Sequence, residues 1–129
     1  MGPQDAPSVG STMWNSITGY LKNLVYGTKN LDLRSVKASE VLRIARQKHG
    51  QTIDALNANL APFRSRGGKL IHYIGWDDSS VRPMSSIEYY ESVAAQMGGV
   101  SEVHPFYRLF MAPGMGHCGG GIAPSAVGQ

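Results

Sequence analysis

The 129-residue chain has the length of one ordinary domain, and its 42% hydrophobic and 16% charged residues are typical of a folded protein. A complete α/β enzyme usually needs roughly 250 residues or more, so a partial domain has to be considered. The net charge of +3 is spread along the chain without interleaved stacking aromatics, which argues against nucleic-acid binding. There is no apolar run of roughly 18 residues and no charged segment followed by an apolar one, so the sequence predicts neither a membrane span nor a signal peptide.

The amino-terminal part of the chain begins with a segment that has no regular hydrophobic pattern. Residues 1–13 are rich in Gly, Pro and Ser and have no periodic apolar face, which predicts a flexible lead-in. From Trp14 to Tyr26, aromatic and aliphatic residues recur at a spacing that fits one helical stripe or an irregular packed segment. We therefore expect the ordered domain to begin near Trp14.

Two helices are expected next. Ser35 or Ser39 is suited to cap a helix that buries its aliphatic residues and ends near Gly50, since Gly tolerates the left-handed conformation after a last turn. A second, shorter helix is predicted from Thr52 to Leu60, with Pro62 as its stop.

The central and carboxyl-terminal parts alternate between strand and helix patterns. Lys69 to Ile74 is a short β-favouring run after a Gly-Gly turn, and Phe106 to Met111 is a second such run. Between them, Ser85 to Met97 carries apolar residues at helical spacing and is closed by two glycines. The order strand, helix, strand predicts a βαβ crossover, which means a parallel pair of strands in an α/β sheet with flanking helices.

Each predicted strand is followed by a loop that carries a group capable of proton transfer. Asp77 and Asp78 follow the first strand, and His117 follows the second. The carboxyl ends of neighbouring parallel strands lie at the same edge of a sheet, so Asp78 and His117 can meet although they are far apart in sequence. An Asp at Nδ1 of a His leaves Nε2 free to accept a proton from a hydroxyl nucleophile, as in a Ser-Asp-His triad. The alternative is an exposed acid in a turn and an unrelated loop histidine.

Five segments around these groups carry a more specific pattern: Gly67–Ile71, Gly75–Asp78 with Val81 and Pro83, Tyr89–Tyr90, Phe106–Met111 and Pro113–Gly121. From Tyr20 to about Pro124 the chain resembles the tannase and feruloyl esterase family of α/β-hydrolases. The resemblance implies that Asp78 is the triad acid and His117 the triad histidine. It also implies that residues 14–124 are the carboxyl-terminal portion of the catalytic domain, a partial α/β-hydrolase fold, with 125–129 as a tail.

Several further properties follow from the resemblance alone. Cys118 corresponds to one half of a disulfide whose other Cys precedes the nucleophilic Ser in the family, and the resemblance implies a secreted or extracellular enzyme. The calcium-binding lid of the family would lie upstream, so no cofactor or metal is expected within this chain. The sequence departs from the family pattern at Ile74, where a His is common, and at Asn59, where an Asp is usual.

The nucleophile is the main departure. Neither Gly-x-Ser-x-Gly nor Cys-Ser occurs in the sequence, so no Ser is assigned as nucleophile. We therefore expect a fragment of a carboxylic ester hydrolase that is inactive alone. In the intact enzyme the substrate would be a small phenolic ester, of the gallate or ferulate type. The alternative is a non-catalytic binding or interaction piece derived from an esterase.

Other candidate groups fit structural roles better. Adjacent acids such as Asp77 and Asp78 point apart on a loop, which argues against a metal pair. Gly119 to Gly121 lack the Lys-Ser/Thr and the helix of a phosphate-binding loop, so a turn behind the histidine is expected. The pair Tyr89 and Tyr90 is expected to place one ring in the core. The remaining histidines, at positions 49, 72 and 104, show no partner pattern and are expected to be surface or strand residues.

Overall fold

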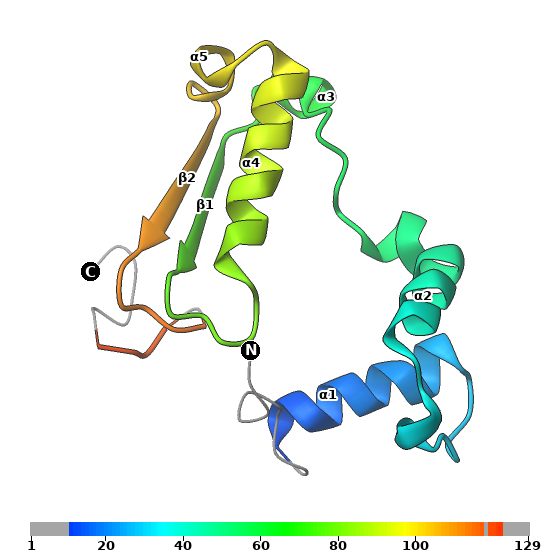
Figure 1. Cartoon of the computed structure of the whole chain (residues 1–129). Coiled ribbons are helices and arrows are strands. Elements are labelled where there is room, and N and C mark those ends of the chain that lie inside the picture. The colour runs from blue at the N-terminus through cyan, green and yellow to red at the C-terminus, as the bar shows by residue number, and fades with distance from the viewer. Residues whose placement is uncertain (1–10, 118, 123–129) are drawn as a thin grey trace. The chain divides into compact units, whose positions relative to one another are not determined.

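The structure is a computed structural model that describes residues 11–117 and 119–122. Most of the predicted lead-in, the predicted tail and Cys118 lie outside these ranges. The chain divides into two compact units, Met1–Ala55 and Leu56–Gln129, which are called unit 1 and unit 2 below. Figure 1 draws the helices and strands of both units.

Unit 1 begins with helix α1, Thr12–Tyr20, which the Ser11 side chain caps by accepting a hydrogen bond from the Trp14 N–H at 3.2 Å. Ser at this position satisfies one of the backbone donors that a helix start leaves free. The chain continues without a break into η2, Leu21–Val25, a π-helical turn. The apolar stripe predicted from Trp14 onward is thus helical.

The second part of unit 1 contains the 3₁₀ turn η3, Leu33–Ser35, and helix α2, Ala38–Ile53. The predicted caps are wrong: the residue before α2 is Lys37, and no side chain caps this end. Gly50 also does not end the helix, because its backbone stays outside the left-handed region that makes Gly useful as a stop. The helix runs on for three more residues.

Long-range hydrogen bonds join α2 to η2 within unit 1. The Lys48 ammonium donates to the Val25 carbonyl at 2.7 Å, and His49 Nε2 lies 2.9 Å from the Leu24 carbonyl oxygen. His49 therefore has a partner that the sequence pattern did not reveal. These bonds satisfy carbonyl groups at the carboxyl end of η2, where a helix lacks internal donors.

The segment that opens unit 2 differs from the prediction. A helix was expected from Thr52 to Leu60, but α2 ends at Ile53 and the chain is non-helical up to α3, Ala61–Ser65. Asn57 Oδ1 accepts the Asn59 N–H at 3.0 Å, and Asn59 Oδ1 accepts the Ala61 N–H at 3.1 Å. Such local bonds compete with a helix. Pro62, expected as a stop, lies in the first turn of α3, where its missing N–H costs nothing.

The sheet of unit 2 consists of two parallel strands, β1, Leu70–Gly75, and β2, Tyr107–Ala112. Their register pairs Leu70 with Tyr107 at one end and Gly75 with Ala112 at the other. Helix α4, Pro83–Met97, connects them and lies along one face of the pair (Figure 1). This confirms the predicted βαβ unit and the α/β class. The short helix α5, Val100–Val103, was not predicted.

The core of unit 2 lies between the sheet and α4. Its buried residues are Val93, Ala94, Val103, Phe106 and Tyr107. Tyr90 packs edge-on against Tyr107 with ring centroids 5.0 Å apart, and Tyr89 lies 6.4 Å from the same ring. Both tyrosines thus contact the core, where one was expected. On the opposite face of the sheet, the side chains of Ile71, Tyr73 and Phe110 are exposed.

Candidate functional site

The loop after β1 turns sharply and directs one carboxylate inward. The Trp76 N–H donates to the Ala112 carbonyl at 3.0 Å, so the loop stays tied to the end of β2. The Asp78 N–H donates back to the Gly75 carbonyl at 3.3 Å, which closes the turn. Asp77 is exposed on this loop, whereas Asp78 is buried.

The segment after β2 forms a hydrogen-bonded hairpin that carries the histidine. The Gly116 N–H donates to the Gly120 carbonyl and the Ile122 N–H donates to the Gly114 carbonyl, both at 3.0 Å. Met115 and Gly121 form an antiparallel bridge between the two arms. His117 directly follows Gly116, in the loop that joins the two arms, and Gly120 and Gly121 belong to the returning arm.

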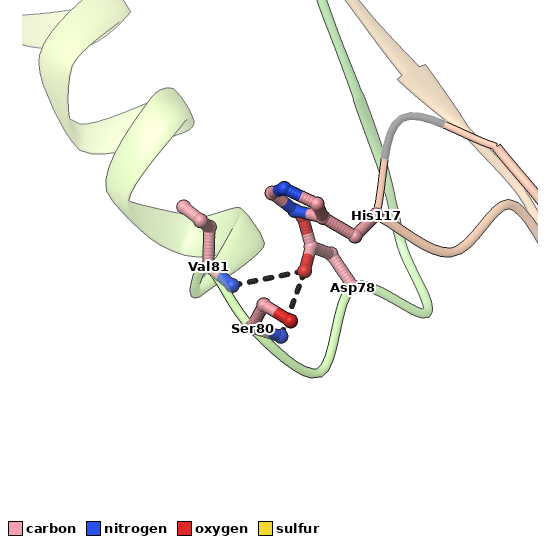
Figure 2. A network of polar contacts seen from close by, with 4 residues as sticks. All are labelled: Asp78, Ser80, Val81 and His117. Carbon is pink, nitrogen blue, oxygen red and sulfur yellow. Dashed lines mark hydrogen bonds and ion pairs between the residues drawn. The ribbon is translucent and has the colours of Figure 1, made fainter. Parts of the chain in front are cut away.

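The two loops bring Asp78 and His117 together, as expected from their places after neighbouring parallel strands. His117 Nδ1 lies 2.9 Å from Asp78 Oδ2. The other carboxylate oxygen, Oδ1, accepts hydrogen bonds from the backbone N–H groups of Ser80 at 2.8 Å and Val81 at 2.9 Å. Figure 2 shows the imidazole facing the carboxylate, with both N–H groups on its far side.

The surroundings of Asp78 favour its charged form. Burial by itself raises the pKa of this carboxyl group. The hydrogen bonds from the Val81 N–H, from His117 and from the Ser80 N–H, together with the attraction of a charged imidazole, outweigh burial and lower the pKa below its usual value. Asp78 is therefore a carboxylate at neutral pH and is held in one orientation by bonds to both oxygens.

The histidine of this pair is accessible, unlike the acid. The His117 side chain is 55% exposed, whereas that of Asp78 is 3% exposed. With Nδ1 bonded to Asp78, the remaining ring nitrogen is Nε2, which is available to exchange a proton with a further group. A buried carboxylate that orients an exposed imidazole is an arrangement suited to general acid-base chemistry.

The other candidates from the sequence are placed differently. Asp77 takes no part in the Asp78–His117 contact. Over residues 11–117 and 119–122 the structure contains no group of three or more His, Cys, Asp or Glu side chains that could hold a metal ion. The predicted disulfide half, Cys118, lies outside the described residues.

Two features of unit 2, the first of them at the candidate site, were not predicted from the sequence. The Ser80 and Val81 N–H groups hold Asp78 as an Asx-type turn does, and an Asp followed by small polar residues and then a Pro-initiated helix was an available signal for it. The second feature is the contact between His72 Nδ1 and the Tyr107 hydroxyl, 3.0 Å apart across the strand pair. No local sequence pattern predicts that contact.

No helix within the described part of the chain is long and apolar enough to cross a membrane.

Comparison with known proteins gives relatives over nearly the whole chain. The family model described as "Tannase and feruloyl esterase" matches residues 5–129. Feruloyl esterase B of Aspergillus niger is 35% identical over 99% of this chain and 25% of its own length. An uncharacterized esterase of Xanthomonas campestris pv. campestris is 42% identical over 72% of this chain and 18% of its own length.

Solved structures show the same similarity in three dimensions. Feruloyl esterase B from Aspergillus oryzae matches with a TM-score of 0.78 and 34% identity, over 86% of this chain and 22% of that chain. Tannin acyl hydrolase from Aspergillus niger matches with a TM-score of 0.68 and 30% identity, over 77% and 20% respectively. The chain thus spans only a quarter or less of the length of these proteins. On the strength of the family model and these relatives, the chain belongs to the tannase and feruloyl esterase family.

Proposed function

We propose that this chain supplies the acid and the histidine of a Ser-Asp-His triad in a carboxylic ester hydrolase. The observation that carries the proposal is the 2.9 Å contact between His117 Nδ1 and Asp78 Oδ2, with the histidine exposed and the acid buried. Family membership supports esterase chemistry as the use of this pair. The serine would come from outside this sequence, because no Gly-x-Ser-x-Gly or Cys-Ser element occurs in it.

The mechanism assigns a distinct step to each group. His117 Nε2 accepts the proton of the serine hydroxyl as that oxygen attacks the ester carbonyl, and it then donates the proton to the leaving alcohol. Asp78 stabilises the imidazolium that exists between these steps and holds the ring in the correct tautomer. A water molecule repeats the sequence on the acyl-enzyme. Donors that stabilise the oxyanion would lie in the remainder of the protein.

The proposed substrate class is taken from the names of the relatives. Similar proteins carry the names feruloyl esterase and tannin acyl hydrolase, which supports a small phenolic ester of the ferulate or gallate type as substrate. The proposal includes a disulfide from Cys118 to a Cys beside the nucleophile, an extracellular location, and a calcium-binding lid supplied by another part of the protein. Neither the disulfide nor the lid takes part in the steps assigned to Asp78 and His117.

The test is a chimera in which this chain replaces its matching segment in Aspergillus oryzae feruloyl esterase B. We expect the chimera to hydrolyse methyl ferulate, and His117→Ala to lower kcat by roughly 10³-fold. Asp78→Asn should lower kcat by a similar order, since it removes the orienting charge. His104→Ala is the matched control, because His104 is an exposed histidine of the same unit outside the pair.

The outcome against the proposal is equally clear. A folded chimera that hydrolyses the ester at an unchanged rate with His117→Ala would show that the pair has no catalytic role. The chain alone provides a second check: we expect only background hydrolysis from it. Turnover by the isolated chain would show that it contains its own nucleophile.

A further inference from the structure

We propose that Gly75 is a positioning residue for the Asp78–His117 pair, and that its function is to leave space for the backbone of the histidine hairpin. Gly75 is the last residue of β1 and is buried. The inference rests on the proposed function, in which this pair does the chemistry. It adds a residue that touches neither the substrate nor the reacting atoms.

The backbone of the histidine hairpin approaches Gly75 more closely than any residue with a Cβ atom would permit. A Cβ atom at Gly75 would lie closer to the Met115 carbonyl oxygen and carbon, and to the Gly116 carbonyl oxygen, than the 3.0 Å that Cβ atoms keep from other atoms. These neighbours are main-chain atoms, so no side-chain rotation can relieve the overlap. The φ angle of Gly75 is not in the left-handed region, so Gly is required here for space and not for backbone conformation.

The same contact ties the acid loop to the hairpin. The Met115 carbonyl that occupies the space over Gly75 accepts the Asp77 N–H at 3.1 Å. The Met115 side chain is 1% exposed, so this arm of the hairpin is anchored in the protein. Asp77 precedes the triad acid directly, and Met115 precedes the histidine by two residues. The contact is therefore made between the two segments that carry the pair.

A side chain at Gly75 would separate these segments. Restoring normal contact with the Met115 carbonyl needs a shift of the order of 1 Å, and a misplacement of that size can cost about 10²-fold in rate at a catalytic site. Two hydrogen bonds join the acid loop to the histidine hairpin: the one from the Asp77 N–H to the Met115 carbonyl and the one between His117 Nδ1 and Asp78. Both should weaken together.

Other glycines of the chain provide the comparison. Gly121 also lies close to backbone atoms, but its φ of +93° means that a substitution there is strained for a second reason. A Cβ atom at Gly19, in helix α1, would meet no atom within 4 Å apart from its chain neighbours and the backbone of its own helix, and the φ angle of Gly19 is not in the left-handed region. Gly19→Ala is thus a matched control that adds the same methyl group in open space.

The experiment uses the full 129-residue chain, labelled with ¹⁵N, in three forms: wild type, Gly75→Ala and Gly19→Ala. Amide hydrogen exchange reports the Asp77 N–H, and long-range ¹H–¹⁵N spectra report which nitrogen of His117 carries the proton. We expect Gly75→Ala to raise the Asp77 exchange rate by about tenfold or more and to reduce the Nδ1-protonated form, at unchanged helix content by circular dichroism. Gly19→Ala should match the wild type.

Unchanged Asp77 exchange and an unchanged His117 tautomer in a folded Gly75→Ala chain would overturn the inference. If Gly75→Ala does not fold, the wild type decides: an Asp77 amide protected like the β1 amides supports the contact, and a freely exchanging one overturns it. The proposed function fails by a different result, a chimera whose hydrolysis does not depend on His117. The two failures are therefore distinguishable.

Discussion

Unit 1 and unit 2 differ in how they bury their apolar residues. Among the described residues, the only buried hydrophobic side chain of unit 1 is Val25. Unit 2 buries a continuous cluster between α4 and the sheet and holds both members of the candidate pair. The candidate site thus belongs to the better-packed unit, where rigid strands fix the loops that carry it.

The largest expected effect is on the core of unit 2. Phe106 is 4% exposed and belongs to the buried cluster. Phe106→Ala should reduce the free energy of unfolding by about 3–5 kcal/mol, because it removes a buried ring and leaves a cavity. Leu42→Ala in unit 1, where the side chain is 56% exposed, should change it by roughly 0.5 kcal/mol or less. Urea titration followed by circular dichroism measures both values, and equal losses would remove the distinction between the units.

A smaller effect is expected at the Tyr107 hydroxyl. Burial, followed by the nearby Tyr89 and Tyr90, raises the pKa of Tyr107 to about 12. The unfolded chain loses this proton near the ordinary value of about 10, so the stabilisation is complete below pH 10 and is lost as the pH rises toward 12. Tyr107→Phe should flatten this alkaline decline. At neutral pH it should cost about 1–2 kcal/mol, since His72 Nδ1 loses its partner.

Thermal melts between pH 8 and 12 measure this difference. Tyr73→Phe is the control, because Tyr73 is exposed on the opposite face of the sheet and does not contribute to the raised pKa of Tyr107. An alkaline decline that persists unchanged in Tyr107→Phe would contradict the assignment.

At acidic pH, the free energy of unfolding should depend on the protonation of Asp78. Its pKa is lowered in the folded state, so its stabilising contribution is present above the ordinary Asp value of about 4 and is lost as the pH falls through the folded-state pKa. Asp78→Asn should cost about 1 kcal/mol at pH 7 and should weaken the acid-dependent loss. Asp77→Asn, at an exposed neighbour, is the control. Equal acid profiles for the two variants, measured by melts from pH 2 to 6, would count against a stabilised Asp78 carboxylate.

The smallest effect concerns the exposed ion pair between Arg64 and Glu102. Their nitrogen and oxygen atoms are 3.2 Å apart, and the two side chains are 43% and 53% exposed. Glu102→Gln should lower the free energy of unfolding by less than about 1 kcal/mol, and the difference should vanish at high salt because exposed charges are screened. A loss comparable to that of Phe106→Ala in the same titration would show that surface charge, and not the core, stabilises unit 2.

Much of unit 2 could be predicted from local patterns. The two strands and α4 combine apolar periodicity with glycine and proline boundaries, and the structure places them within a residue or two of the expected positions. The meeting of Asp78 and His117 was predictable because parallel strands end at the same edge of a sheet. The order and direction of the strands were sufficient to predict this contact, without any detail of side-chain packing.

The wrong or missed predictions concern residues that can serve more than one structural role. Pro62 can end one helix or begin the next. The choice depends on the hydrogen bonds that the side chains of Asn57 and Asn59 accept from the N–H groups of Asn59 and Ala61, because these bonds keep the preceding segment non-helical. Gly75 looked like part of a motif, but its close approach to Met115 depends on a hairpin about 40 residues later. Contacts at such sequence separation leave no periodic trace, so the structure was needed to find them.

The most direct test of the central claim is the tautomer of neutral His117 in the 129-residue chain, read from long-range ¹H–¹⁵N spectra. The contact with Asp78 predicts that Nδ1 carries the proton and Nε2 does not. Asp78→Asn should remove this preference, while Asp77→Asn should leave it intact. A folded chain in which His117 carries its proton on Nε2, with the same spectrum in Asp78→Asn, would contradict the account.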